Sequence, residues 1–160
     1  MGDLMATQYT AGLSAGQILT AATMNQIGAA WETWTPALTA SVTNPTLGTG
    51  STITGRYGRV QKTVFGNARI IFGTSGVAAG SGFYYVSTPI TAQAAGPAAG
   101  SGWLFDASTF LLRQVEVGLD TTGRFGLYID NTTSYGVAAG VPWTWAASDQ
   151  IIISFQYEAV

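Results

Sequence analysis

The sequence predicts an all-β protein, a jelly-roll-like β-sandwich preceded by an N-terminal arm and a short helix. Two observations lead to this prediction. Alternating apolar and polar runs recur at intervals of about 8–12 residues, which suits some seven or eight strands, and no helical pattern follows residue 35. A chain of 160 residues is also the right size for one domain with a core. We therefore expect an arm over residues 1–35 and a sandwich over residues 36–160.

Residues 1–16 are mostly small or polar and are interrupted by glycine, so this segment cannot form a hydrophobic core of its own. Apolar residues then recur at spacings of three and four from Met24 to Trp34, and Thr20 suits the N-cap of a helix that ends near Ala30. Such a short helix needs a surface to dock on, either a partner or the chain's own β domain. The side chains that we expect to attach the arm to a partner are Leu13, Ile18, Leu19, Met24, Ile27, Trp31 and Trp34.

Residues 33–50 are rich in Thr, Pro and Gly, and each proline holds the residue before it in extended geometry. We interpret this segment as a connector with one edge strand near Ala37–Val42. The next segment, residues 51–73, contains two alternating runs on either side of a short polar joint, which predicts a β-hairpin. It carries four of the six basic residues of the chain: Arg56, Arg59, Lys62 and Arg69.

The second half of the chain repeats the strand pattern. We expect strands over residues 83–90, 103–106, 111–117, 125–129 and 150–158, with turns at residues 120–123 and 130–134. The last strand should point Ile151, Ile153, Phe155 and Tyr157 into the core. Residues 91–102 contain no large apolar residue and no charge, and we interpret them as a loop.

The composition limits the kinds of partner that the protein can have. Only 9% of the residues are charged, against roughly 25% in an ordinary domain, and the aromatic residues are too numerous for one small core. Both features favour a protein that buries much of its surface against further copies of itself. The alternative is a monomer whose surface consists of small polar side chains. The net charge of −2 argues against a nucleic-acid partner. No apolar run approaches the roughly 20 residues that span a bilayer, and no secretory signal opens the chain, so we expect no membrane partner and synthesis in a cytoplasm.

The sequence contains few side chains that are suited to catalysis. The chain contains no histidine and no cysteine, which removes histidine bases, thiolate nucleophiles and nearly all zinc sites. The carboxylates Asp106, Glu116, Asp120 and Asp130 could supply a glycosidase pair or a calcium site, but they lack the spacing of a ligand loop. We therefore predict no catalytic residue, no metal and no cofactor.

Four residues are candidates for subunit or ligand contact: Tyr57, Arg69, Trp143 and Trp145. The two tryptophans follow Pro142 and project to the same side of an extended segment. Such a pair can stack on sugar rings, but burial in the core or at a subunit contact is the commoner fate of paired rings and the one that we favour.

Three stretches resemble small virion proteins of tailed phages that infect actinobacteria. They are the opening YTAGLSAGQILTAATMNQI followed by WETWTP, the hairpin LGTGSTITGRYGRVQKTVFGNARIIFG, and the close, a Trp-rich segment, an Asp before an Ile run and then QYEAV. The resemblance implies a trimeric virion structural protein with a β-sandwich head and an N-terminal segment that attaches to the particle. Proteins of this kind include head fibres, capsid decoration proteins and minor tail proteins.

Together these observations predict a non-enzymatic homotrimer in the virion, most simply a capsid decoration or head-fibre protein held to the major capsid protein or another virion protein by residues 1–35. A single compact head without coiled-coil heptads or Gly-X-Y repeats favours decoration over a fibre shaft. The alternative is a tail-tip or receptor-binding module that recognises the host surface, with a glycan as its candidate ligand.

Overall fold

The computed structural model describes residues 30–93, 96–130 and 136–160, and these residues form a single antiparallel sheet of nine strands without a helix. The strands are β1 (Glu32–Trp34), β2 (Leu38–Ala40), β3 (Thr52–Val60), β4 (Thr63–Ile71), β5 (Tyr84–Val86), β6 (Gly96–Asp106), β7 (Leu111–Leu119), β8 (Phe125–Tyr128) and β9 (Gln150–Glu158). The predicted all-β class is confirmed. The predicted helix lies almost wholly outside the described residues.

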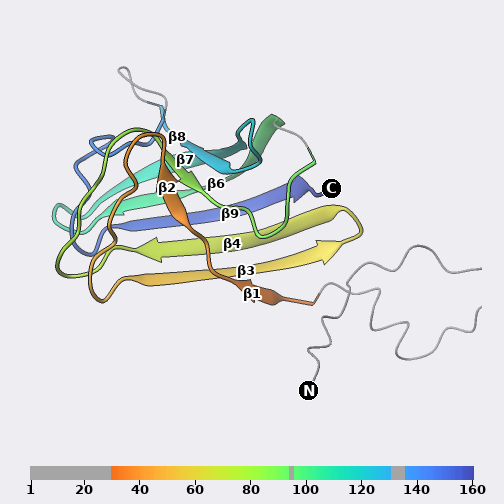
Figure 1. Cartoon of the computed structure of the whole chain (residues 1–160), viewed down its shortest axis with the longest axis horizontal. Helices are drawn as coiled ribbons and strands as arrows, with labels where there is room; N and C mark the ends of the chain where they lie inside the picture. Colours follow the sequence, from red (N-terminus) through yellow and green to blue (C-terminus); the bar gives the residue numbers. More distant parts are fainter. Residues whose placement is uncertain (1–29, 94–95, 131–135) are drawn as a thin grey trace, which may run out of the picture.

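The strands follow the order β1-β3-β4-β9-β6-β7-β8-β5-β2 across the sheet. In Figure 1 the short strands β2 and β5 cross in front of the long strands, because the sheet curls back over itself. Residues of β5 and β8 consequently share one hydrophobic core with residues of β4 and β9. The sandwich-like character is confirmed, while the jelly-roll order of strands stays a prediction.

The predicted hairpin is confirmed as β3 and β4. Their register runs without a break from Thr52 opposite Ile71 to Val60 opposite Thr63, and Gln61 and Lys62 form the turn between them. Gln61 has a φ of 54°, the left-handed geometry that two-residue hairpin turns require. The other edge of β4 pairs with β9 along its whole length, so the hairpin and the last strand form the most regular part of the sheet.

The expected loop over residues 91–102 is wrong in its second half, because β6 begins at Gly96 and runs between β9 and β7. The small residues that suggested a loop are needed for packing. A Cβ atom at Gly100 would lie 2.0 Å from the carbonyl oxygen of Ser154, and one at Gly102 would lie 2.0 Å from that of Ile152. Glycine therefore marks a close approach of two backbones rather than a break in the strand.

A second difference concerns Trp34, which is predicted to lie in the attachment arm after the expected helix. Trp34 instead lies on β1, which pairs with β3 at the edge of the sheet. A strand of three residues is too short to show alternation in the sequence. The sheet thus begins before the expected boundary at residue 36, and the predicted edge strand β2 lies at the opposite edge.

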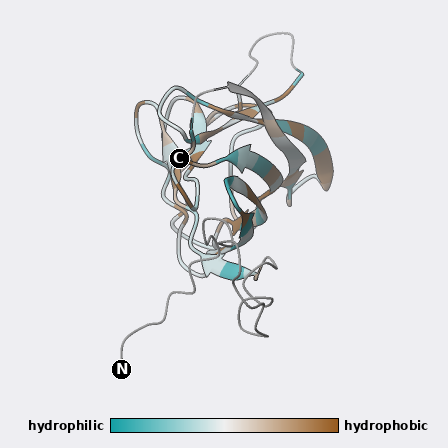
Figure 2. Cartoon of the chain, turned by 90° about the vertical axis from the view of Figure 1, so that its right-hand side faces the viewer, coloured by the Kyte–Doolittle hydropathy of each residue, from teal (hydrophilic) through white to brown (hydrophobic). Residues whose placement is uncertain are grey.

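The core lies inside the curl of the sheet. The side chains of β9 alternate as predicted, with Ile151, Ile153, Phe155 and Tyr157 buried, and Figure 2 shows the matching alternation of hydrophilic and hydrophobic bands along the strands. The ring of Phe125 on β8 lies 4.6 Å from that of Phe155. This contact joins the two layers across the core.

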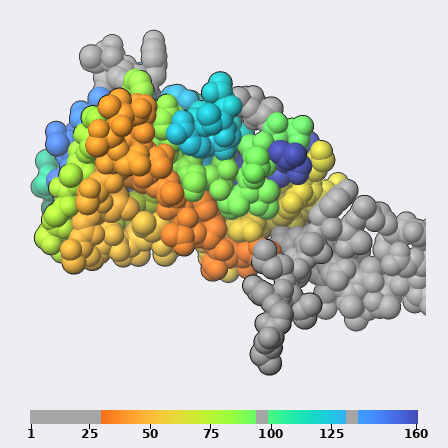
Figure 3. Space-filling view, viewed as in Figure 1, coloured from red at the N-terminus to blue at the C-terminus, as the bar shows by residue number. Residues whose placement is uncertain are grey.

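Two connecting segments cover the opening of the curl. Residues 43–49 form isolated bridges with residues 75–81, and in Figure 3 these orange and yellow-green segments lie at the left-hand end of the molecule. Leu47 and Val77 pack against the core from them. The core is therefore sealed on this side by the chain itself.

The partly buried Tyr57 and the buried Tyr157 make the fold sensitive to alkaline pH. Burial, together with the hydrogen bond to Glu32 and its charge, raises the pKa of Tyr57 to about 12. Burial also raises the pKa of Tyr157 to about 12, although hydrogen bonds at its hydroxyl oppose the shift. That hydroxyl donates to the carbonyl oxygen of Ile90 at 2.6 Å and accepts from its N–H at 3.1 Å.

We expect the free energy of unfolding to fall as the pH rises from 10 to 12. An unfolded tyrosine loses its proton near pH 10 whereas the folded one keeps it, so the stabilisation is complete below pH 10 and is lost through the folded pKa. Urea titrations at several pH values measure this slope, and Tyr157→Phe should make it shallower. An unchanged slope in that variant would assign the alkaline transition to other groups.

Candidate functional site

The candidate site is the outer face of the sheet, the side turned away from the core. Strand register places its side chains in rows across the strands. One row runs from Arg69 through Ile152 and Trp103 to Gln114. A second runs from Ile71 through Gln150 and Phe105 to Leu112. Side chains in such rows are direct neighbours, so the outer face is one continuous surface.

The middle of the outer face is apolar. We call Ile152, Trp103, Phe105 and Leu112 the apolar strip; Trp103 is 51% exposed and Leu112 is 56% exposed. Phe110, which is 80% exposed, extends the strip with its ring 6.1 Å from that of Phe105. Contiguous apolar surface of this kind marks an interaction site more often than scattered single residues do.

Charges of opposite sign lie on the two sides of the apolar strip. The basic flank consists of Arg56 on β3 and Arg69 on β4. The Arg69 guanidinium donates to Oε1 of the neutral Gln150 at 2.8 and 3.3 Å, and the Arg56 guanidinium lies 5.5 Å from the ring centre of Trp31. The acidic flank consists of Glu116 on β7 and Asp130 after β8.

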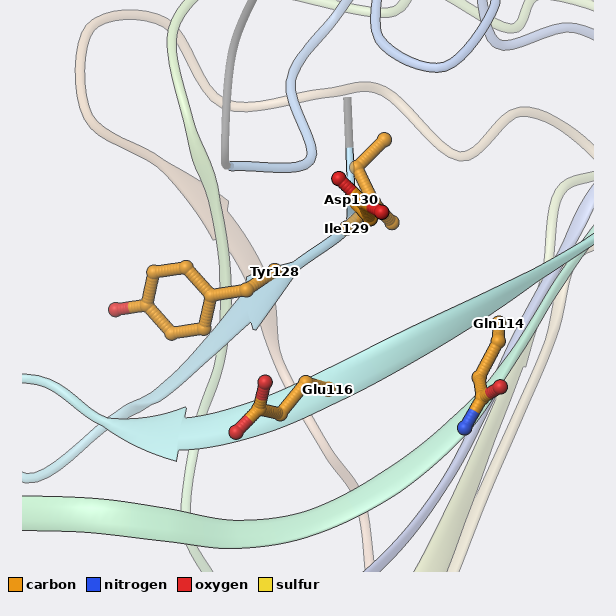
Figure 4. A pocket seen from close by; sticks show the side chains of 5 residues that line it. All are labelled: Gln114, Glu116, Tyr128, Ile129 and Asp130. Carbon is orange, nitrogen blue, oxygen red and sulfur yellow. The ribbon is translucent and has the colours of Figure 1, made fainter. Parts of the chain in front are cut away.

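The acidic flank borders a hollow of about 480 Å³. Its lining is Gln114, Glu116, Tyr128, Ile129 and Asp130 (Figure 4). The carboxylates can accept hydrogen bonds, the amide can accept and donate them, and Tyr128 supplies a ring that is 39% exposed. Within the described part of the chain, no three His, Cys, Asp or Glu residues are grouped closely enough to hold a metal ion.

Two of the other carboxylates are occupied by their own turns. Ser108 and Thr109 donate to Asp106 from both hydroxyls and both backbone N–H groups, and these bonds lower the pKa of that carboxyl against a smaller effect of burial. Burial alone would raise the pKa of Asp120, but hydrogen bonds from Arg124 and Thr122 outweigh it and lower that pKa. Both groups therefore stabilise turns, as predicted for Asp120.

The predicted attachment residues fall in two groups. Leu13, Ile18, Leu19, Met24 and Ile27 lie outside the described residues. Trp34 packs against the chain's own core, with its ring 6.1 Å from that of Phe155. Trp31 is 49% exposed and lies edge-on to Phe65, 5.5 Å away. Trp31 thus belongs to the outer face beside the basic flank.

The four predicted contact residues are also separated. Arg69 lies on the outer face, whereas Tyr57 points to the opposite side and bonds to Glu32. Trp145 is buried, with its ring stacked on Phe72 at 5.3 Å and its Nε1 donating to the Ala138 carbonyl at 2.9 Å. Trp143 packs beside it at 5.5 Å and is partly buried. The pair therefore serves the core and offers no open platform for a sugar.

No known family, curated protein or solved structure matches this chain. The described residues also contain no helix with the length and apolar character needed to cross a membrane.

The apolar strip was not predicted from the sequence, although the sequence contains a pattern that indicates it. Three strands carry adjacent apolar residues instead of strict alternation: Trp103 to Phe105, Leu111 to Leu112 and Ile151 to Ile153. Such runs are typical of strands that are covered on both faces. The described residues cover only the inner face of these strands.

Proposed function

We propose that this chain is a non-enzymatic structural protein of a tailed-phage virion, a homotrimeric capsid decoration or head-fibre protein that attaches through its N-terminal arm. The exposed apolar strip at the centre of the sheet supports this proposal best, because it suits a protein that completes its fold by association. The phage assignment is supported by the three sequence motifs alone. The expected partners are two further copies and the major capsid protein or another virion protein.

The chemistry of the described residues supports a role without catalysis. Asp106 and Asp120 are held by their turns, and Asp149 is buried and accepts from the backbone N–H groups of Ala107 and Ala146 at 3.0 and 2.8 Å. Glu32 accepts from the Tyr57 hydroxyl. Of the three other carboxylates, Glu158 lies on the last strand, and Glu116 and Asp130 lie on the wall of an open hollow. A glycosidase would need one of its two carboxyls held protonated in a closed cleft.

Two truncations test the attachment arm. A chain that begins at Ala30 retains β1 and should fold and associate like the full chain, yet fail to bind capsids that lack this protein. A chain that begins at Thr35 also loses the packing of Trp34 and the Tyr57–Glu32 hydrogen bond, so its melting temperature should fall. Thermal unfolding and cosedimentation with capsids measure the two effects. Capsid binding by the Ala30 chain at full strength would place the attachment site in the β domain.

Receptor binding is the second candidate, favoured by the hollow beside Tyr128 and Glu116. A reconstruction of the whole particle separates the candidates, because decoration places the protein on the capsid and receptor binding places it at the tail tip. Purified full-length protein provides a second measurement. Binding to host cells without binding to capsids would favour the receptor module and a host-surface glycan as ligand.

A further inference from the structure

We propose that three copies associate head to tail through the outer face, with the apolar strips around a three-fold axis and the basic flank of each copy against the acidic flank of the next. The inference rests on the proposed homotrimer and assigns its interface. The occupant of the apolar strip is thus a second copy of this chain.

Apolar burial is the first argument. The strip crosses β9, β6 and β7, the middle of the sheet, and Trp103 and Leu112 expose about half of their surfaces. Large aromatic and aliphatic residues at the centre of a patch with polar surroundings are the usual anchors of an interface. On the outer face, polar and charged residues surround the strip on both sides, as Gln114 and Arg69 do within one row.

Charge complementarity is the second argument. The hairpin strands β3 and β4 carry basic residues and no acidic residue. Glu116 and Asp130 lie beyond the apolar strip. Arg69 and Glu116 are on strands separated by β9 and β6, and strands are spaced about 4.8 Å apart, so about 14 Å separates the two flanks within one copy. Opposite charges at that distance pair between copies rather than within one.

The curvature of the sheet is the third argument. Because the core lies inside the curl, the outer face is convex. Two convex faces that meet directly touch only along a narrow line. Three copies around an axis avoid this, because the basic flank of each copy contacts one neighbour and its acidic flank contacts the other. Such a head-to-tail contact closes into a ring when the rotation fits.

The first test places a charge in the strip of the full-length protein. Leu112→Asp should raise the dissociation constant of the trimer by about 30-fold or more, the effect of losing a central interface residue. Sedimentation equilibrium measures the constant, and circular dichroism checks that the fold is retained. Val42→Asp is the matched control, because Val42 is 76% exposed and lies outside the sheet; it should leave the constant unchanged.

The second test reverses charges on the flanks. Arg69→Glu and Glu116→Lys should each weaken the trimer, because like charges then face each other across every contact. The double variant should recover much of the lost affinity, since the opposite charges are restored between neighbouring copies. Failure of the double variant to recover while Leu112→Asp still dissociates the trimer would overturn the head-to-tail pairing.

The remaining outcomes separate this inference from the proposed function. A trimer unaffected by Leu112→Asp would overturn the interface and leave the homotrimer standing. A wild-type dimer would overturn the ring. A wild-type monomer at micromolar concentration would overturn the homotrimer and the interface together. If that monomer bound capsids and Leu112→Asp abolished the binding, the occupant of the strip would be a virion protein instead of a second copy.

Discussion

Truncating Trp145 to alanine should lower the free energy of unfolding by about 3–5 kcal/mol, the usual cost of removing a buried aromatic ring. Trp145 is 3% exposed and lies between Phe72 and Tyr84, with ring centres 5.3 and 5.7 Å away. The variant also removes the donor to the Ala138 carbonyl. Urea unfolding of the purified protein measures the loss, and Trp145→Phe should retain part of the packing.

Trp143→Ala is the matched comparison and should cost less. Trp143 is only partly buried, and its Nε1 is buried without a hydrogen-bond partner in the described structure. Removing an unsatisfied donor offsets part of the lost packing. Equal losses at the two positions would mean that Trp143 is covered further in the assembled protein, which a repeat of the measurement at low protein concentration would reveal.

Gly102→Ala should destabilise the protein on the order of 3 kcal/mol, because the new methyl group overlaps backbone atoms. Its Cβ atom would lie 2.0 Å from the Ile152 carbonyl oxygen and 2.9 Å from the Cα atom of Ile153. Strand β6 cannot move away easily, since it is hydrogen-bonded to β9 on one side and β7 on the other. The same strand carries Trp103, so we also expect weaker association.

Gly140→Ala is the control for this effect, because a Cβ atom there would meet nothing within 4 Å. Its change should stay within about 0.5 kcal/mol. Denaturant midpoints of the two variants, measured together, separate the steric clash from the general effect of replacing glycine. A Gly102→Ala protein as stable as the control would show that β6 and β9 are farther apart than the structure has them.

The Gly102→Ala prediction bears on the proposed function through β6, the central strand of the outer face. Leu104 of this strand is fully buried in the core, while its neighbours Trp103 and Phe105 belong to the apolar strip. One strand therefore connects the stability of the domain to the surface that we propose for trimer formation. Variants at Trp145 change the core alone, so they should lower stability without changing the partner surface.

The sequence by itself determined the all-β class, the hairpin of β3 and β4 and the inward set of β9. These features depend on an alternation with a period of two, which is local and needs no partner to be recognised. It also determined the scarcity of catalytic groups, because that follows from composition. The runs with apolar residues on both faces were present as well, but they do not reveal which face is left open.

The tertiary structure decided the rest. It joined nine strands into one curled sheet, placed Trp34 on an edge strand, buried Trp145, and turned part of an expected loop into β6. Each of these depends on contacts between distant segments, such as the approach of Gly102 to Ile152. The outer face arises in the same way: strand order, which local periodicity does not encode, places the apolar strip between a basic and an acidic flank.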